Sequence, residues 1–264
     1  MRIFSRMFSD IALTISFIFL ICSPYPAIAA PISSIVGTIF DKDSKKTLPL
    51  YDFLVTNEKP SPSEILVKSF FRNKKTGVLE VSEEVRYESG KLISYKMFQN
   101  QIHEIGTAEL KENRIFFKKQ KIDKDGKLST IKTDDEKLEP NTIVMDQLEE
   151  LLHQHWAELI AGENIEARFI AVSRLETVGF KFFVDEEVLY MGKPALMIKM
   201  KATAFFVSLF FKPIIFYFEK EGGHHLLEVI GRMPVKEKTG EDDWSDIEAN
   251  LVIQKRIPGE LTRY

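Results

Sequence analysis

Alternation of apolar and polar residues dominates the first half of the chain. In residues 78–87 one face of an extended segment would be apolar and the other polar or charged. The apolar face holds Leu79, Val81, Val85 and Tyr87. A period of two is typical of a half-buried β-strand. Ser89-Gly90-Lys91 then predicts a hairpin turn. From Leu48 to about Lys132 the chain therefore predicts consecutive antiparallel strands.

Similar segments, separated by turn-forming residues, recur to the end of the chain. Gly222-Gly223 and Lys236–Trp244 are expected to be turns or loops. No linker divides the chain, so one domain is predicted. The further predicted strands are Ile65–Phe71, Leu92–Phe98, Ile102–Leu110, Arg114–Ile122, Ile165–Val172, Thr177–Val184, Ala195–Ala202, Ile214–Glu219, Leu226–Arg232 and Ile247–Gln254.

One segment follows a helical period instead. Ile143–Ala161 predicts a single amphipathic helix, with Asn141 or Thr142 as its N-cap and Gly162 as its C-terminal cap. Its apolar stripe should pack on a sheet. The stripe holds Val144, Met145, Leu148, Leu151, Leu152, His155, Trp156 and Leu159.

These elements predict a mainly β fold. An antiparallel sheet of about ten strands cannot stay flat, because strands twist, and it must curl, close or split. One helix cannot cover both faces of such a sheet. We therefore expect a strongly curved sheet, or incomplete barrel, with the amphipathic helix packed in or against its concavity.

The N-terminus predicts export. Arg2 and Arg6 precede an apolar run, Ile11–Ile21, and Ala27-Ile28-Ala29 supplies the small residues that a signal peptidase requires. Residues 1–29 are the predicted signal peptide, cut after Ala29, and residues 30–264 the periplasmic or secreted domain. An uncleaved anchor would need about 20 apolar residues, and a lipoprotein would need small residues before Cys22, where Phe19-Leu20-Ile21 stand.

Composition narrows the function. Cys22 is the only cysteine and lies in the predicted signal peptide, so structural disulfides and thiolate chemistry are not expected in the mature chain. The formal net charge of −3 argues against nucleic acid as a partner, since nucleic-acid binding needs a basic stripe. No cofactor motif is present, and neither a Gly-x-Ser-x-Gly elbow nor a P-loop occurs.

The most apolar stretch is Ala204–Phe218, which Pro213 divides into a short helix or loop and a strand. Its uncharged run is too short to span a membrane. The residues could fill the core, as buried aromatics commonly do. Alternatively they could line a pocket or mouth for an acyl chain or an apolar peptide. The residues concerned are Phe205, Phe206, Leu209, Phe210 and Phe211.

Two polar residues interrupt apolar faces. His155, beside Trp156, is expected to be a satisfied core residue, or else an anchor for a ligand headgroup or a pH-sensitive group. Glu83 needs a partner or a proton if buried, and Arg86, Arg168 or a ligand could serve. We expect it instead at the open edge of the curved sheet, in water. The spacing of the five histidines predicts no metal site.

Short motifs resemble an uncharacterised group of exported bacterial proteins. They are Tyr87-x-x-x-Gly90-Lys91-Leu92-Ile93-Ser94-Tyr95, the run His155–Glu163, Arg168-Phe169, and Leu175–Phe180. The resemblance covers about Leu66 to Ile253. It implies the architecture of the curved half-barrels of periplasmic lipoprotein carriers, and it carries over no catalytic residue.

The leading hypothesis is a non-enzymatic periplasmic protein that binds a lipid-like or apolar ligand in the concavity. Phe205–Phe211, His155 and Trp156 would line that site. Two alternatives remain: a module that docks another envelope protein through its phenylalanine-rich patch, and a hydrolase whose site is assembled from distant residues.

Overall fold

The fold is one sheet of fifteen strands, antiparallel except at one end, where the two-residue strand β9 runs parallel to β10. The computed structural model describes residues 33–204, 212–241 and 243–257. Within them the strands form a single open sheet in the order β8-β7-β6-β5-β4-β3-β2-β1-β15-β14-β13-β12-β11-β10-β9. The predicted mainly β, strongly curved sheet is confirmed, with more strands than the ten expected.

Most strands are between seven and fifteen residues long, and several are longer than predicted. Of the residues Lys236–Trp244, expected to be a turn or loop, the first three still belong to β14 and the last begins β15. The strands are β1 (Ser33–Asp41), β2 (Pro49–Ser61), β3 (Glu64–Asn73), β4 (Leu79–Glu88), β5 (Lys91–Gln99), β6 (Glu104–Lys111), β7 (Arg114–Ile122), β8 (Leu128–Lys137), β9 (Thr142–Ile143), β10 (Ile165–Ala171), β11 (Glu176–Tyr190), β12 (Lys193–Ala202), β13 (Ile214–Glu219), β14 (Leu226–Lys238) and β15 (Trp244–Ile257).

Nearly all strands pair with their neighbours in sequence, as expected of hairpins. Ser89 and Gly90 have φ values of 49° and 75°, which fits the predicted tight turn between β4 and β5. One ladder joins distant parts of the chain: β1 pairs antiparallel with β15, with Thr38 opposite Val252. The two ends of the described chain therefore lie side by side in the middle of the sheet.

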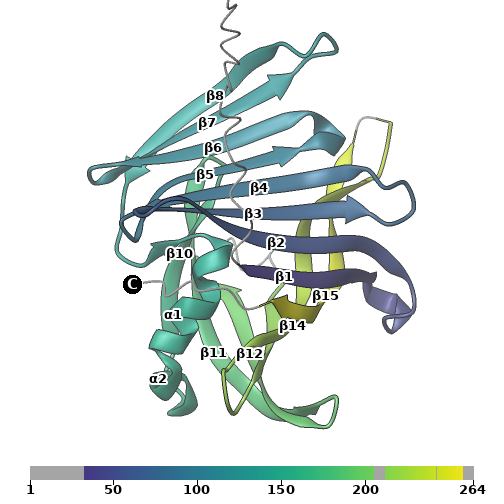
Figure 1. Cartoon of the computed structure of the whole chain (residues 1–264), viewed down its shortest axis with the longest axis vertical. Coiled ribbons are helices and arrows are strands. Elements are labelled where there is room, and N and C mark those ends of the chain that lie inside the picture. Colours follow the sequence, from purple (N-terminus) through teal and green to yellow (C-terminus); the bar gives the residue numbers. More distant parts are fainter. Residues whose placement is uncertain (1–32, 205–211, 242, 258–264) are drawn as a thin grey trace, which may run out of the picture.

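The sheet is rolled, so that its two halves face each other. Figure 1 shows β2–β8 running across the view while β10–β12 run in another direction below and behind them. Apolar residues of β1–β4 and of β14 and β15 share one cluster, which includes Val81 and Met233. A Cβ atom on Gly106 of β6 would lie 2.9 Å from Cβ of Val172, the residue after β10. The rolled sheet thus encloses an inner face, as an incomplete barrel does.

The helical segment packs on this inner face, as predicted, but it is broken. It comprises the 3-10 helix η3 (Met145–Gln147) and the helices α1 (Leu148–Gln154) and α2 (Trp156–Ile160). His155 separates α1 from α2 with φ −113° and ψ 23°. The predicted single helix over 143–161 is therefore wrong. Gly162 does follow α2 with φ +87°, as expected of a C-terminal cap.

The start of the helical segment also differs from the prediction. Asn141 has φ +54° and Thr142 belongs to β9, so neither caps a helix. The Gln147 side chain instead accepts a hydrogen bond from the Val144 N–H group. Met145 is 48% exposed and does not belong to the buried stripe. The reason is that residues 142–144 are extended, which removes the helical geometry assumed for them.

The helices bury their apolar residues in the largest cluster of the core. Leu148, Leu151, Leu152, Trp156 and Leu159 pack with residues of β10–β13 such as Phe182 and Phe216. None of the helices in the described part of the chain is long and apolar enough to cross a lipid bilayer.

An ion pair between an exposed lysine and a buried glutamate ties the β1–β2 connection to β14. Lys46 Nζ lies 2.6 Å from Glu228 Oε2, and the Glu228 side chain is only 1% exposed. The same ammonium lies 5.0 Å from the centre of the Tyr190 ring. Both Lys45 and Lys46 have positive φ, which turns the chain so that Lys46 reaches β14. An ionised carboxylate at this depth depends on its partner.

Replacing Lys46 by methionine should lower the free energy of unfolding by about 2 kcal/mol, because a buried carboxylate loses its partner. This loss is smaller than that for a fully buried ion pair, because the Lys46 side chain is 38% exposed. Urea denaturation measures it. Lys45→Met is the matched control, since Lys45 is exposed and also has positive φ. Equal losses in both variants would contradict the role given to the ion pair.

Candidate functional site

A carboxyl group stands among apolar residues on the inner face of the sheet. Glu83 of β4 lies in a row of paired residues that crosses the first half of the sheet. Its direct neighbours are Ser69 on β3 and Met97 on β5. Along β4 the residues on either side with the same orientation are Val81 and Val85, both buried. The sequence led us to expect Glu83 at the open edge of the sheet, in water. That expectation is wrong, because the residue is partly buried and lies on a strand within the sheet.

Neither of the arginines considered as partners of Glu83 contacts it. Tyr95 of β5 is the partner: its hydroxyl donates a hydrogen bond of 2.6 Å to Glu83 Oε1. A second pair lies nearby, in which the Tyr87 hydroxyl donates to both carboxylate oxygens of Asp146, each at 2.9 Å. Tyrosine hydroxyls thus satisfy two carboxyl groups, one from β4 and one from η3.

Burial raises the pKa of Glu83 to about 7, and the negative charge of Asp146 acts in the same direction. The hydrogen bond from Tyr95 opposes this shift by stabilising the carboxylate. Burial, followed by the charge of Glu83, also raises the pKa of Tyr95 well above its ordinary value. Glu83 therefore changes its charge near neutral pH, while Tyr95 stays a hydrogen-bond donor.

Val81 and Val85 are buried, but other apolar side chains of the inner face, including Met97 beside Glu83, are not fully buried. Met97 and Val229 each lie at the junction of two core clusters, and Val55 borders one of them. All three side chains are partly exposed. Perturbed ionisable groups beside accessible apolar surface are a frequent property of binding and catalytic sites. We therefore take Glu83, Tyr95, Tyr87 and Asp146 as the candidate site and call them the inner carboxyl cluster.

The predicted phenylalanine site lies outside the described residues. Phe205, Phe206, Leu209, Phe210 and Phe211 all belong to residues 205–211, so their role as core or as ligand contacts stays a prediction. The strand predicted after Pro213 is present as β13.

The structure separates the other two predicted ligand contacts. Trp156 is 8% exposed and packs in the largest core cluster, where its ring stacks on His224 with centroids 4.2 Å apart. The His155 side chain is 38% exposed, and its Nδ1 lies 3.4 Å from Glu158 Oε1. His155 was placed on the apolar stripe by assuming a regular helix. The break at this residue turns it toward solvent.

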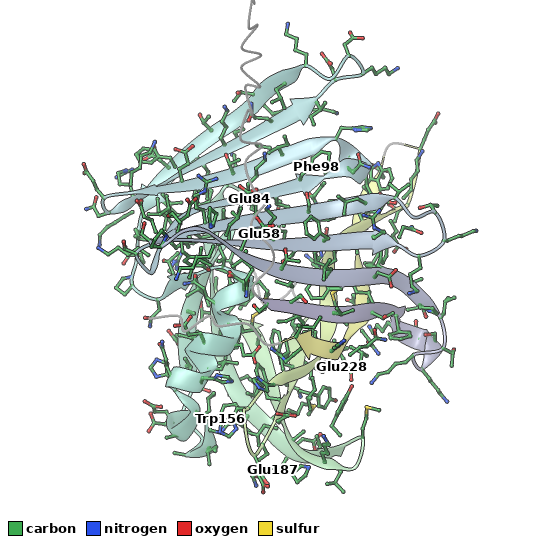
Figure 2. All side chains as sticks on the ribbon, in the orientation of Figure 1. Glu58, Glu84, Phe98, Trp156, Glu187 and Glu228 are labelled. Carbon is green, nitrogen blue, oxygen red and sulfur yellow. The ribbon has the colours of Figure 1, made fainter. Side chains whose placement is uncertain are left out.

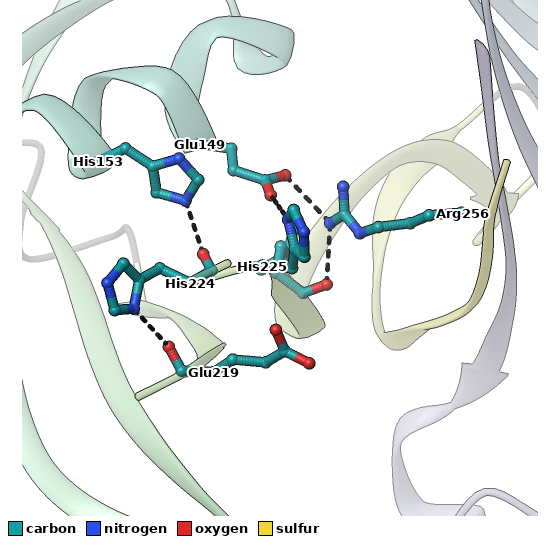
Figure 3. Close-up of polar contacts among 7 residues, drawn as sticks. Glu149, His153, Glu219, His224, His225 and Arg256 are labelled. Carbon is teal, nitrogen blue, oxygen red and sulfur yellow. Dashed lines mark hydrogen bonds and ion pairs between the residues drawn. The ribbon is translucent and has the colours of Figure 1, made fainter. Parts of the chain in front are cut away.

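His153 joins a polar network between α1 and the β13–β14 turn. Its Nε2 lies 2.7 Å from the carbonyl oxygen of His224 (Figure 3). In the same network Glu149 contacts His225 Nδ1 at 3.0 Å and accepts a hydrogen bond from Arg256, also at 3.0 Å. Among the described residues no group of three or more histidine, cysteine, aspartate or glutamate side chains is arranged to hold a metal ion. The network therefore fastens the helix to the sheet.

The outer face carries a shallow hollow of about 300 Å³ over β4–β7. Glu84 and Phe98, both labelled in Figure 2, belong to its lining, as do Lys96, Ile105 and Glu83 itself. Glu84 is the neighbour of Glu83 in sequence but belongs to the opposite face of the sheet, because successive side chains in a strand alternate. It therefore offers a matched control for changes at Glu83.

Comparison with solved structures finds a likeness in fold. No protein-family model and no curated protein matches the sequence. A crystal structure of a beta-barrel-like protein of the domain of unknown function DUF1849 from Brucella abortus is similar in fold. It has 11% sequence identity and a TM-score of 0.45, over 88% of this chain and 99% of that chain. No activity, ligand or partner follows from this likeness.

Proposed function

We propose that this chain is an exported, non-enzymatic binding protein of the bacterial envelope. Its ligand would be an apolar molecule with one hydrogen-bond-donating group, such as a hydroxyl or an amine. The observation that carries the proposal is the position of Glu83, an acceptor on the inner face among partly exposed apolar side chains. The signal-peptide pattern of residues 1–29 supports export.

The charge of the cluster defines the ligand head group. Tyr95 occupies one oxygen of Glu83, and Tyr87 occupies both oxygens of Asp146. The remaining acceptor capacity of Glu83 calls for a donor. Two acidic groups would repel a carboxylate when ionised, so a fatty amine or a fatty alcohol suits the site better than a fatty acid.

Three probes with the same alkyl chain test this preference: dodecylamine, dodecanol and dodecanoate, titrated into the purified protein by calorimetry at pH 8. We expect the amine and the alcohol to bind, and dodecanoate to bind at least about tenfold more weakly, a difference of about 1.4 kcal/mol. Glu83→Gln should abolish the preference for the amine over dodecanoate.

Glu84→Gln is the control, because it removes a carboxyl group from the outer face of the same strand, and it should leave all three affinities unchanged. Failure of every probe to bind folded wild-type protein would exclude the proposed ligand class. An equal effect of the two substitutions would remove Glu83 from the site.

The two alternative functions remain predictions. Docking of an envelope protein depends on residues 205–211, which lie outside the described part of the chain. A hydrolase would use an ionisable pair such as Glu83 and Asp146.

A further inference from the structure

A second hollow, of about 400 Å³, lies on the other half of the sheet, where β9, β10 and β11 meet. It is distinct from the inner carboxyl cluster. Arg168 and Gly179 line it, and both belong to the short motifs that resemble exported bacterial proteins. Thr203, Asn141, Glu139 and Glu166 also contribute.

Arg168 is held in a fixed orientation. Its Nε donates to Thr177 Oγ1 at 2.8 Å, and its Nη2 donates to the Thr177 carbonyl oxygen at 3.0 Å. Its backbone N–H also bonds to the Asn141 carbonyl oxygen at 3.0 Å. Nη1 has no hydrogen-bond partner among the residues that the structure describes. Two contacts thus orient the planar guanidinium and leave one nitrogen available.

Gly179 allows Thr203 to approach that nitrogen closely. It is the residue opposite Arg168 in the β10–β11 ladder. A Cβ atom at this position would lie 3.6 Å from Arg168 Nη1 and only 2.6 Å from Thr203 Oγ1. The Thr203 hydroxyl therefore occupies the place that a side chain at position 179 would fill, and this brings the hydroxyl close to the Arg168 nitrogen at the wall of the hollow. A guanidinium beside a hydroxyl is a suitable partner for a carboxylate.

Acidic groups balance the arginine. Glu166 lies two residues before Arg168 on the same face of β10, so their Cα atoms are ~7 Å apart along the strand. Its side chain is exposed. Glu139 is the second acidic residue of the hollow, and Lys137 Nζ contacts it at 3.3 Å. These carboxylates would repel a simple anion, whereas they would attract the ammonium group of a molecule that carries both charges.

We propose that this hollow binds a small zwitterion of the size of an amino acid or a dipeptide. Arg168 and Thr203 bind its carboxylate, and Glu166 binds its ammonium group. The spacing of the two charges along one strand matches a ligand whose own charges lie a few bonds apart.

Glycylglycine is the probe, titrated into isotope-labelled wild-type protein while the backbone amide resonances of Arg168, Gly179 and Thr203 are followed. We expect saturable shifts of these resonances. N-acetyl-glycylglycine, which lacks the ammonium group, and the methyl ester of glycylglycine, which lacks the carboxylate, should each bind at least about tenfold more weakly.

Arg168→Lys keeps the positive charge but loses the planar group that Thr177 orients, and it should weaken binding by about tenfold. Thr203→Val is a second, milder variant that removes only the hydroxyl. Arg174→Lys is the control, because Arg174 pairs with Glu176 at 2.6 Å and does not line the hollow. Absence of saturable shifts would overturn the proposal. So would equal affinity for the blocked dipeptides, or an equal effect of Arg174→Lys.

Discussion

Phe216→Ala should lower the free energy of unfolding by about 4 kcal/mol, which is typical of a phenylalanine removed from a well-packed core. Phe216 is 0% exposed and lies between Ile198 of β12 and Val229 of β14 in the sheet. Its ring lies 6.4 Å from that of Phe182 and 6.5 Å from that of Phe218. Truncation therefore leaves a cavity that neighbouring aromatic rings cannot easily fill.

Urea denaturation followed by far-ultraviolet circular dichroism measures this loss. Phe116→Ala is the control: Phe116 is also a strand phenylalanine, but it is 42% exposed, and its replacement should change stability by less than about 1 kcal/mol. Phe216→Leu, which keeps most of the volume, should cost about 1.5 kcal/mol. A loss at Phe116 as large as that at Phe216 would mean that the assignment of inner and outer faces is wrong.

The second large effect concerns pH. The pKa of Glu83 is about 7 in the folded protein, against an ordinary value of 4.5. Between these values the folded chain retains a proton that the unfolded chain has released. Stability from this group is therefore fully present below pH 4.5 and is lost as the pH rises to 7. The total is about 3 kcal/mol, at 1.36 kcal/mol for each pH unit of the shift.

Glu83→Gln should remove this dependence, because the amide stays neutral at every pH. The variant should be more stable than wild type by up to about 3 kcal/mol at pH 8 and nearly equal to it at pH 4. Comparing the two proteins at each pH cancels the carboxyl groups they share, such as Glu248, whose pKa is lowered by Lys212 and Lys42. Glu84→Gln should follow wild type throughout. Parallel pH profiles of wild type and Glu83→Gln would show that Glu83 ionises as freely as an exposed glutamate.

The curved meander could be predicted because hairpin turns and alternation are local signals. The sheet has more strands than the sequence predicted, because some strands lack an apolar face or depend on distant residues. All but one residue of β8 are exposed, so that strand has no apolar face to reveal it. In β1, a Cβ atom on Gly37 would lie 2.8 Å from the carbonyl oxygen of Val252, so β15 requires a glycine there. Because β15 is at the far end of the chain, no local signal marks Gly37 as part of a strand.

The candidate site was predictable only in part. The interruption of an apolar face by Glu83 was a visible signal, but its pairing with Tyr95 depends on the register of β4 and β5 and on the roll of the sheet. The break at His155 depends on one backbone conformation, and this turned His155 away from the apolar stripe on which the sequence had placed it. The arrangement around Arg168 required Thr177, Gly179 and Thr203 to meet from different strands.

The pairing of β1 with β15 has a consequence for how the molecule is made. Each half of the sheet, on either side of the β1–β15 pairing, can form from hairpins as soon as its own residues have been synthesised. The β1–β15 pairing that joins the two halves can form only after β15 has been synthesised, because the two strands are separated by almost the whole described sequence. Contacts of such long range form late and slowly. A chain emerging N-terminus first would thus carry the exposed edge of β1 until synthesis and release are complete.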